Sequence, residues 1–260
     1  MSWPPPDIPR GQGEVRLERN GPLALMVLSN PGARNAMSLG MMSDFLKATE
    51  ALLNEPPLAL IVTGDGGEGF CAGGDLKDVR AHLLKPGAAE AMSQAMGRAT
   101  ARLSTAPFVI VAAVEGAALG GGAELSQLAD WVVMSDSAKI GFVHARLGVS
   151  PGWGGGRLLA RRVGRSAATS VLLQAKVHRV EAAMALGLAD QRSPEGGALR
   201  AAEDWLEPVL SLSPSAIRGL LEMIRAAYSV EHSAVERSVF CDLWGSPAHK
   251  AALDGTGAGQ

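Results

Sequence analysis

The sequence predicts an α/β protein: a core in which strands and helices alternate, followed by a region of helices alone. Short apolar or alternating stretches, typical of strands, are separated by segments whose apolar residues recur at helical spacing. Such alternation indicates an α/β core. From about Leu199 the strand pattern stops and only helical spacing remains. We therefore expect a core over residues 1–198 and a C-terminal helical region over residues 199–260.

Two strands are expected to open the core. Residues 15–19 and 23–28 alternate or run apolar around Asn20-Gly21, a dipeptide typical of hairpin turns. Ser38 then offers an N-cap for a helix that Pro56-Pro57 ends. The hairpin and this helix are the first elements of the predicted fold.

The later elements follow the same local signals. Expected strands lie at residues 58–63, 108–114, 131–135 and 139–142. Expected helices lie at 88–105, just after Gly121, and at 157–163, 199–212, 214–227 and 230–243. The helices after residue 198 carry apolar side chains that must be covered by the core or by a neighbouring subunit.

Composition argues against several classes of function. A formal net charge of −2, without a large basic cluster, gives no reason to expect a nucleic-acid partner. The two cysteines and five histidines are not spaced as metal ligands, so we expect no metal. No leader pattern opens the chain and no apolar run approaches the roughly 18 residues of a membrane span. We expect a cytoplasmic protein without a membrane partner.

Two motifs resemble sites of other enzymes but fail in detail. Residues 148–152 match the G-x-S-x-G elbow of serine hydrolases, with Ser150 in the nucleophile's place. In that elbow the next residue donates its N–H to the oxyanion, and Pro151 has none. Gly116, Ala118 and Gly121 imitate a dinucleotide fingerprint, but its middle glycine is missing. We interpret both segments as turns.

Two glycine-bearing turns, at residues 70–76 and 116–125, indicate a split oxyanion hole. Backbone N–H groups approach a substrate closely only where side chains are absent, so glycine in both turns suits a site that stabilises an enolate. The second turn also carries Glu124, one helical turn beyond Gly121, which would bring its carboxylate toward the carbon next to the bound carbonyl.

Three segments carry a family resemblance. They are Arg34-Asn35-Ala36-Met37, Cys71-Ala72-Gly73-Gly74-Asp75-Leu76 and Gly120-Gly121-Gly122-Ala123-Glu124-Leu125. In this order they resemble the signatures of the crotonase (enoyl-CoA hydratase/isomerase) superfamily. The resemblance implies a crotonase-like spiral of ββα units with a C-terminal helical trimerisation region, assembled as a homotrimer or homohexamer. It also implies an acyl-CoA substrate and no separate cofactor, because coenzyme A is part of the substrate.

The resemblance also assigns site residues. The N–H groups of Gly74 and Gly121 would bind the thioester oxygen, and Ala36 and Ala72 would contact the adenine through their backbones. The implied substrate-binding set is Arg34, Ala36, Ala72, Gly74, Asp75, Leu76, Lys77, Gly120, Gly121 and Trp153. The resemblance places Arg34 or Lys77 near the phosphates, but a solvated surface position would explain either residue equally well. It makes Trp153 a wall of the acyl pocket, although ordinary packing would explain a tryptophan there equally well.

Glu124 and His144 are the expected catalytic side chains. Glu124 matches a glutamate of the hydratases. The alternative, a first-turn carboxylate that only complements the helix dipole, is less favoured beside the glycine turns. His144 stands where typical hydratases have a second glutamate, which argues against simple hydration. If CO2 loss generates the enolate, Glu124 must be protonated or angled away from the departing carboxylate.

Residues 139–155 and 243–248 resemble a branch of the family that decarboxylates ethylmalonyl-type CoA esters. We therefore expect a lyase acting on ethylmalonyl- or methylmalonyl-type esters. Two alternatives remain open: an enoyl-CoA hydratase/isomerase of fatty-acid-type acyl-CoAs, and a non-catalytic crotonase-fold protein that binds CoA or RNA.

Overall fold

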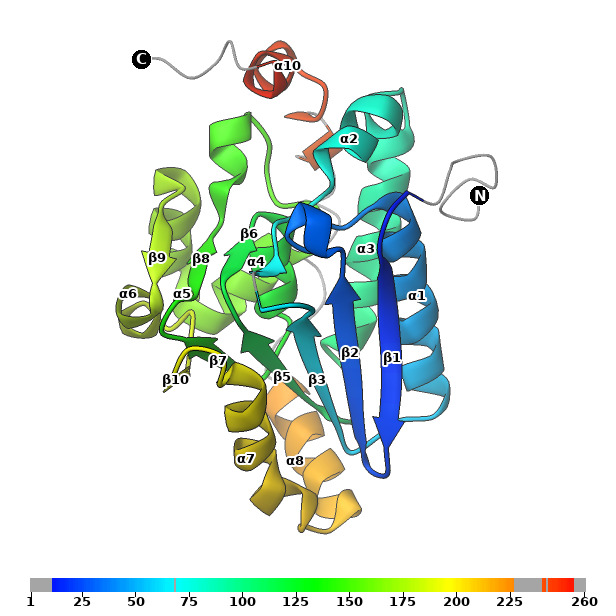
Figure 1. The fold of residues 1–260 in the computed structure, drawn as a ribbon, viewed down its shortest axis with the longest axis vertical. Helices are drawn as coiled ribbons and strands as arrows, with labels where there is room; N and C mark the ends of the chain where they lie inside the picture. Colours follow the sequence, from blue (N-terminus) through cyan, green and yellow to red (C-terminus); the bar gives the residue numbers. More distant parts are fainter. Residues whose placement is uncertain (1–10, 68, 227–239, 242, 255–260) are drawn as a thin grey trace.

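The computed structural model describes residues 11–67, 69–226, 240–241 and 243–254 (Figure 1). Its larger sheet has six strands in the order β1-β2-β3-β5-β7-β10. Their bounds are β1 Glu14–Asn20, β2 Leu23–Ser29, β3 Ala59–Gly64, β5 Val109–Val114, β7 Trp131–Ser135 and β10 Gln191–Ser193. The first pair is antiparallel and the others are parallel. The alternation of strands and helices predicted for the core is confirmed.

A smaller sheet positions the glycine turns. Its strand order is β4-β6-β8-β9, with β4 at Gly69–Cys71, β6 at Ala117–Leu119, β8 at Lys139–Gly141 and β9 at Val177–Arg179. β4 and β6 are parallel neighbours, and each leads directly into one of the two glycine turns. Because parallel strands end at the same edge of a sheet, the two turns lie side by side.

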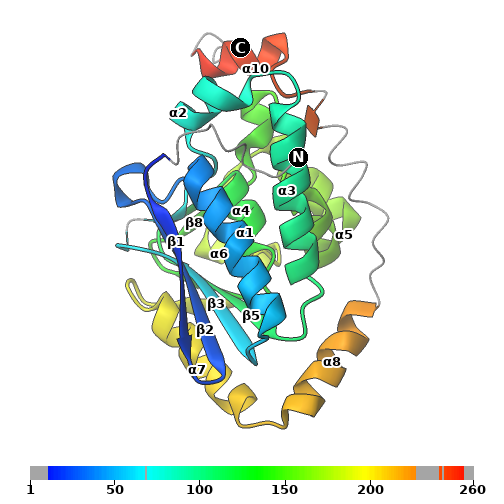
Figure 2. The same cartoon turned by 90° about the vertical axis from the view of Figure 1, so that its right-hand side faces the viewer.

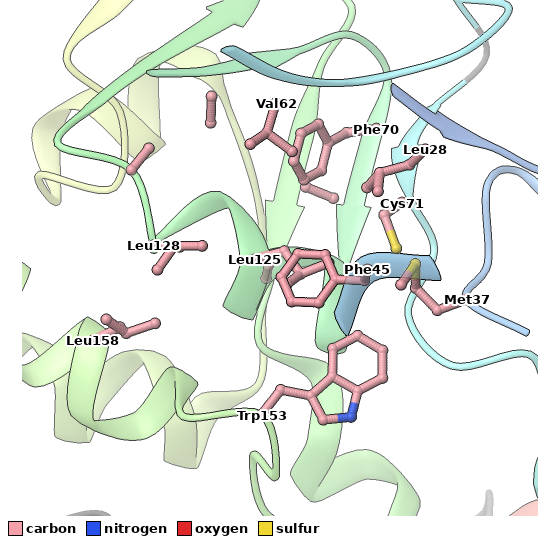
Figure 3. Packing of buried hydrophobic residues seen from close by; sticks show 14 of the residues in the cluster. Leu28, Met37, Phe45, Val62, Phe70, Cys71, Leu125, Leu128, Trp153 and Leu158 are labelled. Atoms are coloured by element: carbon pink, nitrogen blue, oxygen red, sulfur yellow. The ribbon is translucent and has the colours of Figure 1, made fainter. Parts of the chain in front are cut away.

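Helices cover both faces of the larger sheet. Leu60, Val62 and Ile110 point into the main core with α1 (Leu39–Asn54) and α3 (Ala88–Leu103). The alternate positions, including Ile61 and Val111, pack on the opposite side against α7 (Ala198–Leu210) and α8 (Pro214–Ala226). This division follows from the period-two alternation of strand side chains. Figure 3 shows the main core close by, with Phe45, Cys71 and Trp153 in one cluster.

The other helical segments surround the smaller sheet or lie near the ends of the chain. They are η1 Pro31–Ala33, α2 Leu76–Asp78, η2 Val79–Leu83, α4 Gly121–Ser126, η3 Val143–Leu147, α5 Gly155–Gln174, α6 Val180–Ala185 and α10 Pro247–Leu253. Figure 2 shows α8 at the opposite end of the molecule from α10, which lies beside α2. The C-terminal region therefore contributes helices to both ends. None of the described helices combines the length and apolar composition needed to cross a bilayer.

Most local expectations agree with the structure. Ser38 caps α1, since its hydroxyl accepts a hydrogen bond from the Met41 N–H at 3.2 Å. The hairpin turn differs from prediction: Asn20 pairs with Leu23, so Gly21 and Pro22 form the turn, with Gly21 at φ +58°. The expected helix at 157–163 is also longer, because α5 continues past a non-helical Gly164.

The C-terminal boundary was predicted at residue 199, and α7 begins at Ala198. α7 packs against β3, β5 and β7, so it also belongs to the second core cluster. The division into two domains therefore stays a prediction. Most of the helix expected at 230–243 lies outside the described residues.

The N-terminus of α7 is anchored by a buried carboxylate that follows β5. Glu115 accepts hydrogen bonds from the N–H groups of Ala198 at 2.6 Å and Gly196 at 3.3 Å. Glu115→Ala should leave these donors unpaired and lower the free energy of unfolding by about 2 kcal/mol. Urea unfolding measures this, with Glu203→Ala on the exposed face of α7 as control. Equal effects of the two changes would contradict the anchoring role.

Candidate active site

The two glycine turns touch through their backbones. A Cβ atom added at Gly73 would lie 3.0 Å from the Leu119 carbonyl oxygen and 3.4 Å from the Gly121 nitrogen. Gly73 also has φ +100°, a conformation that favours glycine. Glycine at this position therefore allows the two turns to approach as closely as they do.

The N–H groups of Gly74 and Gly121 are left for a ligand by the local backbone geometry. Met37 donates to the Gly73 carbonyl at 2.7 Å and accepts from the Asp75 N–H at 2.9 Å. In this parallel bridge the intervening Gly74 directs its own N–H away from Met37. Gly121 is the first residue of α4, so its N–H has no acceptor within the helix. This arrangement can form an oxyanion hole.

Both glycines line a cavity of about 180 Å³, which we call the inner cavity. Its walls are Met42, Ala72, Gly73, Gly74, Leu76, Val79, Met92, Gly120, Gly121, Glu124, Val143, His144, Leu147, Val149, Gly152, Trp153, Phe240, Trp244, His249 and Leu253. Apolar side chains dominate, and among the described lining residues the titratable side chains are Glu124, His144 and His249. An apolar chamber with a few converging polar groups is typical of a small-molecule site.

The carboxylate of Glu124 is almost fully engaged. The side chain is 2% exposed, and Oε2 accepts hydrogen bonds from the N–H groups of Trp153 at 2.7 Å and Gly155 at 2.8 Å. Oε1 lies 3.0 Å from His144 Nε2 and 3.3 Å from the Gly152 nitrogen. Sequence reasoning directed this carboxylate toward the reacting carbon. In the structure its oxygens instead face His144 and the turn at residues 152–155. For decarboxylation we expected Glu124 to be either protonated or angled away from the departing carboxylate, and this geometry matches the second option.

His144 has one ring nitrogen bound and one available. It lies on η3, 9% exposed, with Nε2 on Glu124. A carboxylate only accepts hydrogen bonds, so Nε2 carries the proton of this contact. Nδ1 is buried and has no partner within the described part of the chain. The Glu124–His144 pair therefore offers Nδ1 as a group that can accept or deliver a proton.

Trp153 forms a wall behind both glycines. A Cβ added at Gly121 would lie 2.2 Å from its Cζ3, whereas one added at Gly74 would lie 3.9 Å from its Cζ2. The indole therefore leaves no room for a side chain at position 121. At position 74 an added Cβ would make only an ordinary van der Waals contact with it. Its backbone N–H also binds Glu124, so one residue connects the oxyanion turns to the acid–histidine pair.

A second cavity of about 470 Å³, the outer cavity, adjoins the first and shares Ala72, Gly74 and Leu76 with it. Its lining contains seven members of the substrate-binding set implied by the resemblance: Arg34, Ala36, Ala72, Gly74, Asp75, Leu76 and Lys77. The remaining members of the predicted set, Gly120, Gly121 and Trp153, line the inner cavity. Asp75 has a local role as well, because its carboxylate accepts from the Lys77 N–H at 2.8 Å and caps α2.

Sequence reasoning missed the C-terminal wall of the inner cavity. Trp244 and His249 lie in this wall, and Trp244 Nε1 donates to the Leu83 carbonyl at 2.5 Å. The sequence assigned no role to any histidine other than His144. The resemblance of residues 243–248 was a signal that this segment matters, but it named no side chain.

Two other chemistries find little support at this site. Burial raises the pKa of the Cys71 thiol to about 12, so it remains a protonated core residue rather than a nucleophile. Over the described residues, no group of three or more His, Cys, Asp or Glu side chains is arranged to hold a metal ion.

Comparisons with known proteins agree with this geometry. The family model described as "Enoyl-CoA hydratase/isomerase" matches residues 18–256. Ethylmalonyl-CoA decarboxylase of Danio rerio is 36% identical, with 95% of this chain and 84% of that protein covered. Its Mus musculus counterpart is 34% identical, with 95% and 78% covered.

Solved structures show the same fold. An enoyl-CoA hydratase/isomerase from Mycobacterium paratuberculosis superimposes with a TM-score of 0.85 at 19% identity, covering 96% of this chain and 99% of that one. An enoyl-CoA hydratase from Polaromonas sp. JS666 has a TM-score of 0.76 at 29% identity, covering 88% and 91%. This chain, with the crotonase fold and the paired glycine turns, belongs to the enoyl-CoA hydratase/isomerase family.

Proposed function

We propose that this protein decarboxylates CoA thioesters of the ethylmalonyl or methylmalonyl type. The observation that carries the proposal is the Glu124–His144 pair in the wall of the inner cavity, in which the buried Nδ1 of His144 has no partner among the described residues. Glu124 is the one carboxylate among the described lining residues, and its oxygens are already bound. The similarity to ethylmalonyl-CoA decarboxylases supports the same reaction.

In the proposed complex the coenzyme occupies the outer cavity and the acyl group enters the inner cavity. The thioester oxygen binds the N–H groups of Gly74 and Gly121, at the junction that both cavities share. These donors bind the oxygen most strongly when it becomes an enolate oxygen, because charge develops there. Each such donor typically contributes about 2.7–4 kcal/mol of transition-state stabilisation.

Decarboxylation breaks the bond between the α-carbon and the free carboxylate. Its electron pair moves into the thioester, which forms the enolate and releases CO2. His144 in its protonated form then transfers the Nδ1 proton to the α-carbon, and Glu124 balances the imidazolium charge through Nε2. Glu124 is thus a positioning residue. Each turnover consumes one proton and requires no oxidant or reductant, so we propose no cofactor beyond the CoA of the substrate.

Enoyl-CoA hydration is the second candidate. It is favoured by the shared oxyanion geometry and by the likeness to an enoyl-CoA hydratase structure at 29% identity. Hydration needs one group to orient water and another to transfer a proton. Only one carboxylate lines the inner cavity among the described residues, which makes decarboxylation the stronger proposal. A purely binding role would leave the buried Glu124–His144 pair without a use.

We further propose that copies of this chain assemble as a homotrimer or homohexamer through the C-terminal helices. On α8 the side chains of Leu220, Met223 and Ile224 are 52–64% exposed. An exposed apolar group on one helix favours burial against another protein surface. The family resemblance supports a second copy as that surface.

A substrate panel tests the proposed function directly. We expect CO2 release from ethylmalonyl-CoA and methylmalonyl-CoA, and little loss of enoyl absorbance with crotonyl-CoA. Purified protein is incubated with each ester while CO2 and absorbance are followed. Rapid hydration of crotonyl-CoA without decarboxylation would establish the second candidate instead.

His144→Gln tests the proton donor. We expect kcat to fall about 10²- to 10⁴-fold, the usual contribution of a positioned acid. In deuterated water the wild type should place deuterium on one face of the α-carbon of butyryl-CoA, whereas the variant should label both faces. His178→Gln on β9, which is not among the residues lining the inner cavity, serves as control. Stereospecific labelling by the His144 variant would show that another group delivers the proton.

Two variants at Gly74 distinguish the loss of its N–H donor from the addition of a side chain. Gly74→Pro removes the N–H and should lower kcat about 10²- to 10³-fold. Gly74→Ala keeps the N–H, and its Cβ makes ordinary contacts at 3.6 and 3.9 Å, so it should lose far less. Steady-state kinetics and circular dichroism of both variants give the comparison. Unchanged turnover in Gly74→Pro would reject the oxyanion assignment.

A further inference from the structure

The inner cavity contains a second histidine that the proposed mechanism does not use. His249 lies on α10, is 2% exposed and belongs to the cavity wall. α10 packs against η3, the segment that carries His144. Two histidines on adjacent segments therefore border one small chamber.

The contacts of His249 fix its tautomer and restrain its ring. Nδ1 accepts a hydrogen bond from the Gly245 N–H at 2.8 Å, so the proton of the neutral ring is on Nε2. The ring also packs against Trp244, with centroids 4.7 Å apart. Within the described segments, no group accepts a hydrogen bond from the Nε2–H. His249 therefore keeps one free donor.

The environment of His249 favours a donor without charge. Burial lowers the pKa of His249, since removal from water penalises the charged ring. His144, in contrast, has a carboxylate as its neighbour. The two histidines thus offer different chemistry to the same acyl group.

A malonyl-type acyl group differs from an enoyl group in carrying a free carboxylate that the site must bind. Its free carboxylate must enter a mainly apolar chamber, and burying an unpaired charge there is costly. The glycine N–H groups are used by the thioester oxygen and His144 by the α-carbon. Glu124 repels a second carboxylate. Two unbound side-chain donors remain among the described groups of the wall, the Nε2–H of His249 and the Nε1–H of Trp153, since Trp244 Nε1 binds the Leu83 carbonyl. The indole of Trp153 packs against Gly74 and Gly121 at the thioester end, which leaves His249 for the carboxylate.

We propose that the Nε2–H of His249 binds the free carboxylate of the substrate and so selects malonyl-type CoA esters over esters that lack this group. This inference rests on the proposed function and names its specificity-determining residue. A neutral donor suits the reaction because charge must leave the carboxylate as the bond breaks. A cation at this place would stabilise the ground state more than the transition state.

The test compares substrates with and without the carboxylate. In His249→Phe the ring remains but the donor is lost, so kcat/KM for ethylmalonyl-CoA should fall about 10- to 100-fold. The inhibition constant of butyryl-CoA, which lacks the carboxylate, should change less than about threefold. His249→Gln retains an N–H donor and should recover most of the lost kcat/KM.

Other outcomes overturn the inference in recognisable ways. Equal weakening for both ligands would mean that His249 only packs the wall, and an unchanged kcat/KM would mean that another group binds the carboxylate. A wild type that releases no CO2 contradicts the proposed function. In that case calorimetry with the intact ethylmalonyl-CoA and with butyryl-CoA makes the same comparison, and loss of ethylmalonyl-CoA binding alone would still support His249 as the carboxylate's partner.

Discussion

The site depends on the hydrogen bonding of one buried carboxylate. Glu124 connects α4 to η3 through His144 and to the start of α5 through the N–H groups of Trp153 and Gly155. A Cβ at Gly155 would lie 2.2 Å from Glu124 Cγ, so the turn closes tightly on this side chain. Because a buried acceptor without its donors is costly, α4, η3 and the turn before α5 must keep their relative positions. Those positions determine where His144 and the residues of the cavity wall lie.

The close approach of two strands supplies the other half of the site. A Cβ at Gly122 would lie 1.9 Å from the Cys71 carbonyl oxygen, so α4 starts in direct contact with the end of β4. This contact brings Gly121 beside the Gly73-Gly74 turn. The geometry of the proposed oxyanion hole is therefore a property of the smaller sheet, and Glu124 and His144 are arranged around a backbone that the fold already fixes.

Local signals predicted what local interactions determine. Ser38 as an N-cap, the glycine turns and the strands β1, β2, β3, β5 and β7 of the larger sheet needed only propensity and spacing. The three-residue strands β4, β6, β9 and β10 were missed because pairing with distant strands, rather than their own residues, defines them. The partners that orient Glu124 could not be predicted for a similar reason: they lie 20 to 31 residues away in the sequence. The position of His249 in the site could not be predicted from the sequence, because its cavity forms only where the C-terminal segment packs against η2 and η3.

The two histidines show how a family scaffold can change its chemistry with few residues. Stabilisation of an enolate requires only the glycine turns, which serve any reaction through that intermediate. What precedes and follows the enolate depends on groups beside the α-carbon. His144 lies next to a carboxylate, which suits the transfer of a proton. His249 is bound by a backbone N–H and packs on an aromatic ring, which suits a neutral donor that recognises a carboxylate without strongly stabilising its charge. In the proposed reaction, different environments for the same residue type divide the acid role from the binding role.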